Sequence, residues 1–345
     1  MGITGTGSNG VCLLGEAWGK VEASRQLPFQ GPAGAKLAKM LGMLGYERDE
    51  FLMTNVYWAQ PPSNRDPTDA EVNSHRHLWE PFFEQPTSIK VIVPLGNVPL
   101  RAVLDLEGIQ GKRGYLWWSE RYQLWVLPTV HPAFILRGNA HWTAIWLRDV
   151  QQAVETASQG PPAAPRRALT LDPSPAVAQE WVGGWNRAQR PPLAFDIETP
   201  GADKDDEDKA EVASGEEKGT IYRIGFAWRV DHVTHALSIP WGAGFDVVVQ
   251  SLLAVEAPRV VWNRHFDVPR LRAHGHVMPG PIHDAQEMWH VLHSDLPKRL
   301  EFVAPVLVPG QVYWKNLIHE RPAFYNAVDA AVTIEAFEAL YGLAA

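Results

Sequence analysis

The chain has 345 residues, enough for two domains, and its 46% hydrophobic and 20% charged content is that of an ordinary globular protein. A formal net charge of -8 excludes a protein that coats nucleic acid nonspecifically. No apolar run is long enough to span a membrane, no export leader is recognisable, and the single cysteine, Cys12, excludes an internal disulfide. We therefore expect a cytoplasmic protein without a membrane partner.

Short apolar runs alternate with helical patterns in the first half of the chain. The apolar runs are VCLLGEA (11–17), FLMTNVYWA (51–59), VIVPLG (91–96) and LWVLPTVHP (124–132), and the helical patterns are 33–45, 69–85, 97–104 and 141–157. This alternation predicts an α/β domain of residues 1–157, with a parallel sheet covered by helices on both faces. Ligands are expected at the carboxyl ends of its strands.

Polar and glycine residues stand where these predicted strands end. Gly15 and Glu16 close the first run, Asn55 lies in the second, and His131 lies in the fourth. A pocket that removes a base needs a ring to stack on it, an amide to read its edge and a donor for the leaving anion. Phe29, Asn55 and His131 have side chains suited to these three tasks.

These segments resemble the uracil-DNA glycosylase superfamily, and family 4 above all. The similar stretches are GEAWGKVEASRQLPFQGPAGAKLAKML, TNVYWAQPPSNRDPTDAE, VIVPLG and PTVHPAFILR, over about residues 11–150. The resemblance implies that Phe29 stacks on uracil, that Asn55 pairs with its edge, and that His131 donates to its carbonyl oxygen. Gly15 belongs to the same uracil-binding motif.

The resemblance also implies roles at the rim of the pocket. Glu16 would lie near the sugar and help to place the water. Leu136 would enter the base stack as an apolar wedge, and Arg137 would touch phosphate. One alternative remains open, in which this domain senses uracil or abasic sites without cutting the glycosidic bond.

The sequence departs from family 4 at two places. Members carry four cysteines that hold an iron–sulfur cluster, whereas Ala59 and His75 occupy two of those positions and the leader has no CxxC. Without thiolates no iron–sulfur cluster is expected. Trp18 stands where the family has proline, and its ring is expected to reshape the lip of the pocket.

Two segments are expected to have no core of their own. Residues 158–190 are rich in proline, glycine and alanine, which predicts a semi-rigid linker with a helix-like patch near 177–185. Residues 201–219 hold eight acids and three lysines, and we interpret them as a disordered loop.

The second half begins with three strand-like runs in succession, LAFDIET (193–199), IYRIGFAWRV (221–230) and THALSIPW (234–241). Helical patterns and one more strand, RVVWNR (259–264), follow. This order predicts a second domain, residues 191–345, whose sheet is antiparallel and then parallel, flanked by helices.

In this half, four acidic residues and one tyrosine are predicted to converge on one site. Alternation along a strand puts Asp196 and Glu198 on one face, and a spacing of four on a helix puts Tyr325 above Asp329. Asp267 comes from a third segment. Carboxylates that converge repel each other unless cations lie between them, which predicts two divalent cations, Mg²⁺ or Mn²⁺, about 3.5–4 Å apart.

Three stretches of this half resemble the three motifs of DEDDy 3′-5′ exonucleases, in particular those of the proofreading domain of family A DNA polymerases. The stretches are FDIET, NRHFDVPRL and YNAVDAAVT. Residues 283–309 are similar to the same domain of phage polymerases. The resemblance implies an RNase H-like fold in which Asp196, Glu198, Asp267 and Asp329 bind metal. It further implies that Tyr325 orients the attacking water and that Asn263 contacts DNA.

Together these patterns predict an enzyme that excises uracil from DNA and hydrolyses DNA from the 3′ end. DNA is the expected partner, as uracil-containing strands or as single-stranded or frayed 3′ ends. A separately encoded DNA polymerase is a further expected partner, because the sequence stops soon after Asp329. In one alternative the exonuclease alone is catalytic, and in another it serves as a proofreading subunit for that polymerase.

Overall fold

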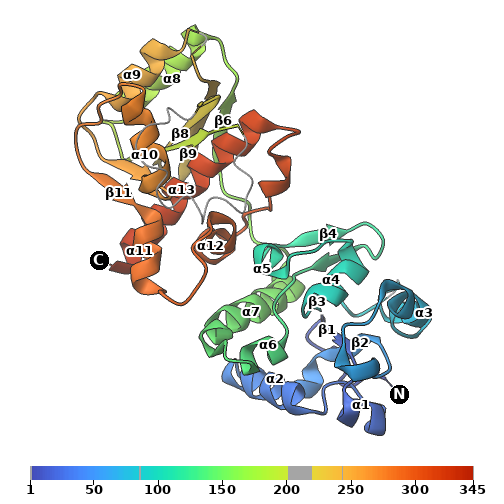
Figure 1. Cartoon of the computed structure of the whole chain (residues 1–345). Helices are drawn as coiled ribbons and strands as arrows, with labels where there is room; N and C mark the ends of the chain where they lie inside the picture. Colours follow the sequence, from blue (N-terminus) through green and yellow to red (C-terminus); the bar gives the residue numbers. More distant parts are fainter. Residues whose placement is uncertain (1, 85–86, 201–219, 243, 345) are drawn as a thin grey trace. The chain divides into compact units, whose positions relative to one another are not determined.

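The structure, a computed structural model, describes residues 2–84, 87–200, 220–242 and 244–344. The chain divides into two compact units (Figure 1). Unit 1 is Met1–Ala164 with Pro309–Val312, and unit 2 is Pro165–Val308 with Tyr313–Ala345. The acidic run 201–219 lies outside the described residues. None of the described helices combines the length and the apolar character needed to cross a membrane.

Unit 1 contains the expected parallel sheet. Its described strands have the order β2-β1-β3-β5-β4, in which the first four are parallel and β4 runs antiparallel at one edge. The strands are β1 (Val11–Ala17), β2 (Leu52–Tyr57), β3 (Val91–Pro94), β4 (Trp117–Ser119) and β5 (Leu124–Val126). Because β1 and β2 are parallel and Gly15 is paired with Asn55, their polar ends meet at the same edge.

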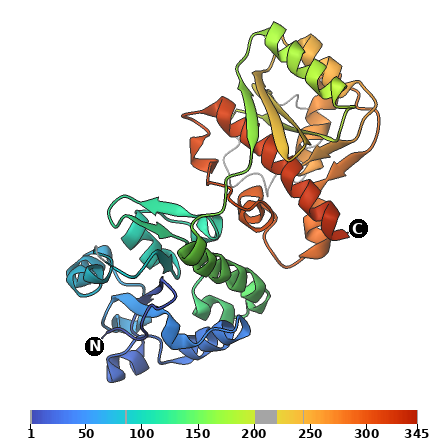
Figure 2. The same cartoon turned by 180° about the vertical axis from the view of Figure 1, so that it is seen from behind.

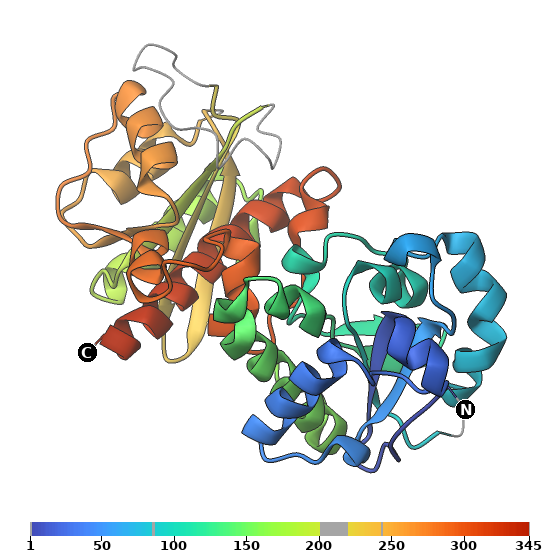
Figure 3. The same cartoon turned by 60° about the horizontal axis from the view of Figure 1, so that its bottom comes forward.

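Helices cover both faces of this sheet. The helices are α1 (Lys20–Arg25), α2 (Pro32–Met43), α3 (Asp69–Trp79), α4 (Asn97–Leu104), α5 (Ile109–Lys112), α6 (Pro132–Leu136) and α7 (Thr143–Gln159). Alternation turns Cys12 and Leu14 toward Trp79 of α3 and Val103 of α4 in one buried cluster. Helix α7 packs on β1 and β3 and also contacts α2, beside which it lies in Figure 3.

Unit 2 contains a mixed sheet with the described order β11-β10-β7-β8-β9-β6. The central strands β7, β8 and β9 are antiparallel, whereas β10, β11 and β6 extend the sheet with parallel pairs. The strands are β6 (Arg167–Leu171), β7 (Leu193–Glu198), β8 (Arg223–Val230), β9 (Val233–Pro240), β10 (Arg259–Val261) and β11 (Ile282–Asp284). The predicted succession of antiparallel and then parallel strands is present, and its assignment as RNase H-like stays a prediction.

Helix α13 is the central helix of unit 2 and packs along β7, β8 and β9, as Figure 2 shows in red. The helices are α8 (Pro175–Arg187), α9 (Asp246–Leu253), α10 (Arg264–Ala273), α11 (Ala285–Leu292), α12 (Leu300–Leu307) and α13 (Pro322–Ala344). At Gly225 of β8 an added Cβ would lie 2.7 Å from Oδ1 of Asn326, so glycine permits α13 to approach the sheet closely.

The predicted linker 158–190 is wrong for most of its length. Residues 167–171 form β6, which pairs with β9 along its whole length. In α8, Ala178, Trp181, Val182 and Trp185 follow helical spacing and are buried in the core of unit 2. The helix-like patch predicted near 177–185 lies within α8, whereas β6 was not predicted, and the second unit begins near residue 165 instead of 191.

Candidate functional sites in the two units

In unit 1, one pocket of about 370 Å³ is lined by the three side chains predicted to contact uracil and by Glu16, which is predicted to place the water. Glu16 comes from the end of β1, Asn55 from β2, Phe29 from the loop before α2, and His131 from the residue before α6. This volume is within the range of small-molecule sites. The structure thus brings together residues that are more than a hundred positions apart in the sequence.

Asn55 lines this pocket with a buried amide. The residue is 3% exposed, and its Nδ2 donates to the carbonyl oxygen of Ala17 at 3.4 Å. Its Oδ1 is buried and accepts no hydrogen bond from the described part of the chain. A buried acceptor without a donor costs free energy, so this atom is suited to a ligand that supplies an N–H.

Phe29 and Asn55 approach each other because residue 15 is a glycine. A Cβ on Gly15 would lie 2.5 Å from Asn55 Nδ2 and 2.6 Å from Phe29 Cζ, closer than real contacts allow. The Phe29 ring is also nearly parallel to that of His131, with centroids 6.3 Å apart and planes at 25°. The three predicted base-contacting side chains therefore surround a common space.

Two charged residues that the sequence did not reveal fix the loop carrying Phe29. Glu22 of α1 accepts hydrogen bonds from the backbone N–H groups of Gln30 at 2.9 Å and Gly31 at 2.7 Å. Arg48 donates to the carbonyl oxygens of Phe29 at 2.7 Å and Pro28 at 2.9 Å. Because Phe29 has a positive φ of 53°, an uncommon conformation, these bonds help to hold it there.

His131 is a neutral donor. Its Nδ1 accepts the backbone N–H of Ala133 at 3.1 Å, which leaves the ring proton of the neutral form on Nε2. Burial lowers the pKa of His131 to about 4, and the positive charge of Arg137 acts in the same direction. The imidazole is therefore uncharged at neutral pH and donates through Nε2.

Glu16 titrates near neutrality. Burial raises the pKa of its carboxyl to about 7, and the neighbouring carboxylate of Asp66 raises it further, against the opposing charge of Arg137. The sequence motifs do not indicate Asp66.

Leu136 at the end of α6 is 48% exposed, and Arg137 follows it as the helix cap. Neither contributes to the described lining of the pocket.

Trp18 does not close the pocket. Its ring packs parallel to that of Trp58, with centroids 6.1 Å apart and planes at 13°, while Trp18 also lines the open cavity. His75, predicted to occupy a cysteine position of the family, accepts the backbone N–H of Trp58 through Nδ1 at 2.8 Å and stacks on Tyr57 at 4.5 Å. Ordinary packing and hydrogen bonds thus hold this segment.

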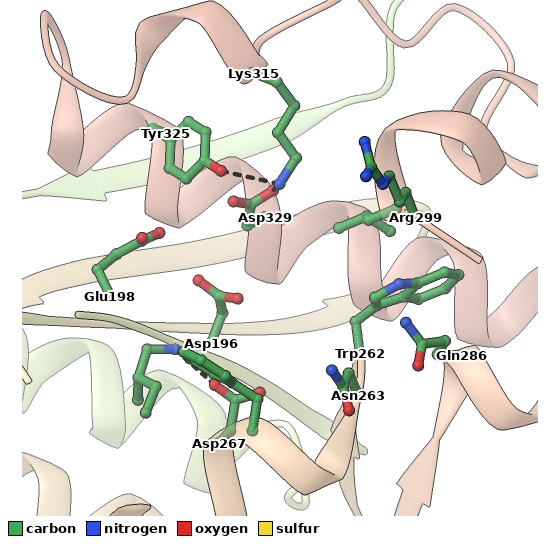
Figure 4. A pocket seen from close by; sticks show the side chains of 13 residues that line it. Asp196, Glu198, Trp262, Asn263, Asp267, Gln286, Arg299, Lys315, Tyr325 and Asp329 are labelled. Atoms are coloured by element: carbon green, nitrogen blue, oxygen red, sulfur yellow. Dashed lines mark hydrogen bonds and ion pairs between the residues drawn. The ribbon is translucent and has the colours of Figure 1, made fainter. Parts of the chain in front are cut away.

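In unit 2, the predicted metal ligands line a second, smaller cavity of about 60 Å³, together with Asn263 and Tyr325. Asp196 and Glu198 project from β7, and Asp329 from α13, one turn after Tyr325. One carboxylate oxygen from each of these three acids lies within 4.8 Å of the others. Figure 4 shows their carboxylates facing a common space.

Asp267 lies apart from that group of three. It projects from α10 into the same cavity, and its Oδ1 accepts the backbone N–H of Ile197 at 3.2 Å. In the described part of the chain, the acids whose oxygens lie within 4.8 Å of one another are Asp196, Glu198 and Asp329, without Asp267. Asn263 also lines the cavity, at the start of α10, with a positive φ of 71°.

Two unforeseen residues hold these acids in place. Asn326 donates to Oδ2 of Asp196 at 2.8 Å. Lys315 donates to Oδ1 of Asp329 at 2.8 Å and to the hydroxyl of Tyr325 at 3.0 Å. Burial raises the pKa of Tyr325, and the carboxylate of Asp329 adds to that effect while Lys315 opposes it. The tyrosine therefore keeps its proton at neutral pH.

Comparison with known proteins bears on unit 1. Residues 3–151 match the family model of the uracil DNA glycosylase superfamily. A type-4 uracil-DNA glycosylase of Sulfurisphaera tokodaii is 30% identical over 190 residues, 52% of this chain and 78% of that protein. Those of Pyrobaculum aerophilum and Thermotoga maritima are 33% and 31% identical, and the matches cover 37% and 41% of this chain and 68% and 75% of those proteins.

Among solved structures, a chain described as "apo form of the nuclease" aligns with 52% of this chain and 82% of its own length. Its TM-score is 0.36 and its identity 15%, too low to assign the fold of unit 2. The three glycosylases above are at least 30% identical to this chain, which covers more than two thirds of each, and this shows the family. Through its first unit, the chain belongs to the uracil DNA glycosylase superfamily.

Proposed function

We propose that unit 1 excises uracil from DNA. The observation that carries this proposal is the buried, unsatisfied Oδ1 of Asn55 in a pocket shared with Phe29 and His131. Uracil presents an N–H beside a carbonyl oxygen, so the base can donate to Oδ1 and accept from Nδ2 of one amide. The type-4 relatives are named for the same activity.

The residues of the pocket have distinct tasks in this reaction. Phe29 stacks on the flipped base, while the N–H of His131 Nε2 donates to the carbonyl oxygen on which charge develops as the glycosidic bond breaks. Such a bond strengthens in the transition state and therefore raises the rate. Glu16, as a carboxylate, orients the water near the sugar.

At the mouth, exposed Leu136 would fill the gap left in the base stack, and Arg137 would contact a phosphate. Neither task requires these residues to line the base pocket. Their place at the end of α6, the short helix that begins after His131, keeps them near the site of base flipping.

The test of glycosylase activity uses a uracil-containing oligonucleotide, EDTA and a final alkali treatment that breaks the strand at abasic sites. Wild-type protein should produce breaks at uracil in EDTA. His131→Ala should slow uracil release far more than it weakens DNA binding, and Asn55→Asp should impair recognition because an acceptor replaces the amide donor. Uracil binding without release by the wild type would favour the sensor alternative.

We further propose that unit 2 hydrolyses DNA from its 3′ end. The carrying observation is the group formed by Asp196, Glu198 and Asp329, with Tyr325 beside it. These oxygen donors fit Mg²⁺ or Mn²⁺, and Asp267 could complete a second position. When bound, two such ions supply charge stabilisation for the attacking and leaving oxygens.

The side chains of unit 2 would position the substrate and the water. Tyr325, protonated at neutral pH, can donate to the attacking water or accept from it. The nucleotide would lie at the opening of this cavity of about 60 Å³, with the ions and the attacking water inside. Asn263, which lines the cavity, would contact the strand there. A separately encoded polymerase would be a fitting partner, since it extends trimmed 3′ ends.

The test of nuclease activity follows nucleotide release from a 5′-labelled strand in Mg²⁺. Asp196→Ala should abolish release and leave uracil excision unchanged, and EDTA should have the same effect. The matched control is Asp295→Ala, which removes an exposed aspartate of the same unit. Full nuclease activity in Asp196→Ala would refute the assignment of this site.

A further inference from the structure

Lys315 is a buried cation inside the acidic cavity of unit 2. It begins the short helix η5 (Lys315–Leu317), is 8% exposed and lines the cavity. Burying an ammonium group is costly unless it is paired and hydrogen-bonded. Here it is both, because Nζ contacts Asp329 at 2.8 Å and the Tyr325 hydroxyl at 3.0 Å (Figure 4).

The chemistry of the ammonium group fixes the direction of the bond to Tyr325. A lysine ammonium has three hydrogens and no acceptor, so the tyrosine oxygen must accept from it. The tyrosine's own hydrogen then points away from Lys315. Figure 4 shows Asp196 and Glu198 across the cavity from Tyr325, on the side to which this hydrogen is free to turn.

Lys315 also restrains Asp329. Both Lys315 Nζ and the indole N–H of Trp314 donate to the same oxygen, Oδ1, each at 2.8 Å. A cation bound through Oδ2 would leave both bonds intact. The carboxylate is thus held in one orientation before any ion arrives.

We propose that Lys315 is a positioning residue of the nuclease site, which directs the hydroxyl hydrogen of Tyr325 toward the attacking water and holds Asp329 ready for its cation. This inference rests on the proposed nuclease function. Lys315 would act through Tyr325 and Asp329 and would not touch the scissile bond.

The experiment is a double-mutant cycle on nucleotide release at saturating Mg²⁺, with wild type, Lys315→Met, Tyr325→Phe and the double variant. Lys315→Met should lower kcat by about 10- to 100-fold, as expected for loss of a hydrogen bond to a charged group. In the Tyr325→Phe background the same change should cost several-fold less than in the wild type, because the hydroxyl to be directed is absent and only the contact with Asp329 is lost. Lys315→Arg, which keeps a charged donor, should retain more activity than Lys315→Met.

Controls separate positioning from folding. Arg187→Met removes an exposed charge at the end of α8 in the same unit, away from the cavity lining, and should leave nuclease activity unchanged. Circular dichroism melting identifies any variant that fails to fold. If Lys315→Met does not fold, Lys315→Gln, which removes the charge and shortens the side chain, replaces it in the cycle, and its loss of kcat should again be smaller in the Tyr325→Phe background.

Equal losses in the two backgrounds, or an unchanged kcat in Lys315→Met, would overturn the positioning role while leaving the nuclease assignment intact. A wild-type protein without nuclease activity would overturn both. Uracil excision, measured on the same preparations, reports on unit 1 and distinguishes these results from inactive protein.

Discussion

Asn326 of α13 donates to Oδ2 of Asp196 on β7 at 2.8 Å, while its own Oδ1 accepts the hydroxyl of Ser238 at 2.7 Å. The amide is fully buried, so its orientation is fixed and with it that of the Asp196 carboxylate. Residues 130 positions apart are joined in this way at the proposed cation site.

The contact between Asn326 and Asp196 should be important to the nuclease. Asn326→Ala leaves buried partners unsatisfied and should reduce the free energy of unfolding by about 1–3 kcal/mol. It should also slow nucleotide release, measured in Mg²⁺ below the melting temperature. Asn186→Ala, on the exposed side of α8, is the control and should change neither quantity. Unaltered nuclease kinetics in Asn326→Ala would contradict the importance of this orientation.

Gly15 should be irreplaceable in the base pocket. Gly15→Ala places a methyl group 2.5 Å from Asn55 and 2.6 Å from Phe29, so one of them must move and uracil excision should fall by at least about tenfold. Gly42→Ala is the matched control, because nothing lies within 4 Å of its added Cβ in α2. That variant should excise uracil normally and be stabilised by up to about 1 kcal/mol. Similar effects of the two alanines on excision would refute the close approach at Gly15.

Glu22 should matter to excision without touching the base. Glu22→Ala deprives the backbone N–H groups of Gln30 and Gly31 of their acceptor, which should cost about 1–3 kcal/mol of stability and misplace Phe29. Glu22→Gln keeps an acceptor oxygen and should lose less on both counts. Steady-state excision kinetics and thermal melting of the two variants measure the difference. If glutamine were as damaging as alanine, the negative charge and not the loop contact would be the cause.

The rate of uracil excision should depend on pH through Glu16. Its raised pKa, about 7, means that the carboxylate forms as the pH rises through neutrality, so kcat/KM should increase with a midpoint near that value. Glu16→Gln should be slow and lack this increase. His131 should add no inflection between ~5 and ~8, because its pKa is lowered to about 4. A midpoint that survives in Glu16→Gln would assign the titration to another group.

The lowered pKa of His131 also predicts a change in stability. Below its ordinary pKa of 6.5 the unfolded chain binds a proton that the folded chain does not bind until about pH 4. This contribution to the free energy of unfolding should therefore fall as the pH drops from 6.5 toward 4. His131→Asn should weaken that dependence in denaturant titrations across this range. A slope identical to wild type would contradict the burial of a neutral imidazole.

Purified protein should contain no iron–sulfur cluster. Cys12 is buried, and burial raises the pKa of its thiol, so it is a poor source of thiolate. Elemental analysis and the visible absorption spectrum measure iron directly. His75→Ala should instead destabilise the segment by removing the acceptor of the Trp58 N–H. Stoichiometric iron would show that the alignment of Ala59 and His75 with cysteine positions is wrong.

The sequence by itself predicted many of the strands and helices of each unit, although not β6, and it placed candidate site residues on them. Alternation and strand ends predicted the parallel sheet of unit 1 and the meeting of Glu16, Asn55 and His131, because the carboxyl ends of parallel strands share one edge. The spacing of four likewise placed Tyr325 beside Asp329 on one helix. These features depend on local periodicity, which a sequence displays directly.

Only the tertiary structure decided which distant groups meet. Residues 167–171 became a strand through pairing with β9, since their own composition favoured a linker. The contacts of Glu22 with Gly31, Asn326 with Asp196, and Lys315 with Tyr325 depend on how loops and helices pack, and no spacing encodes them. Buried polar groups are stabilised by hydrogen-bond partners, and here these partners come from distant parts of the chain, so the residues that orient each site became visible only in the folded molecule.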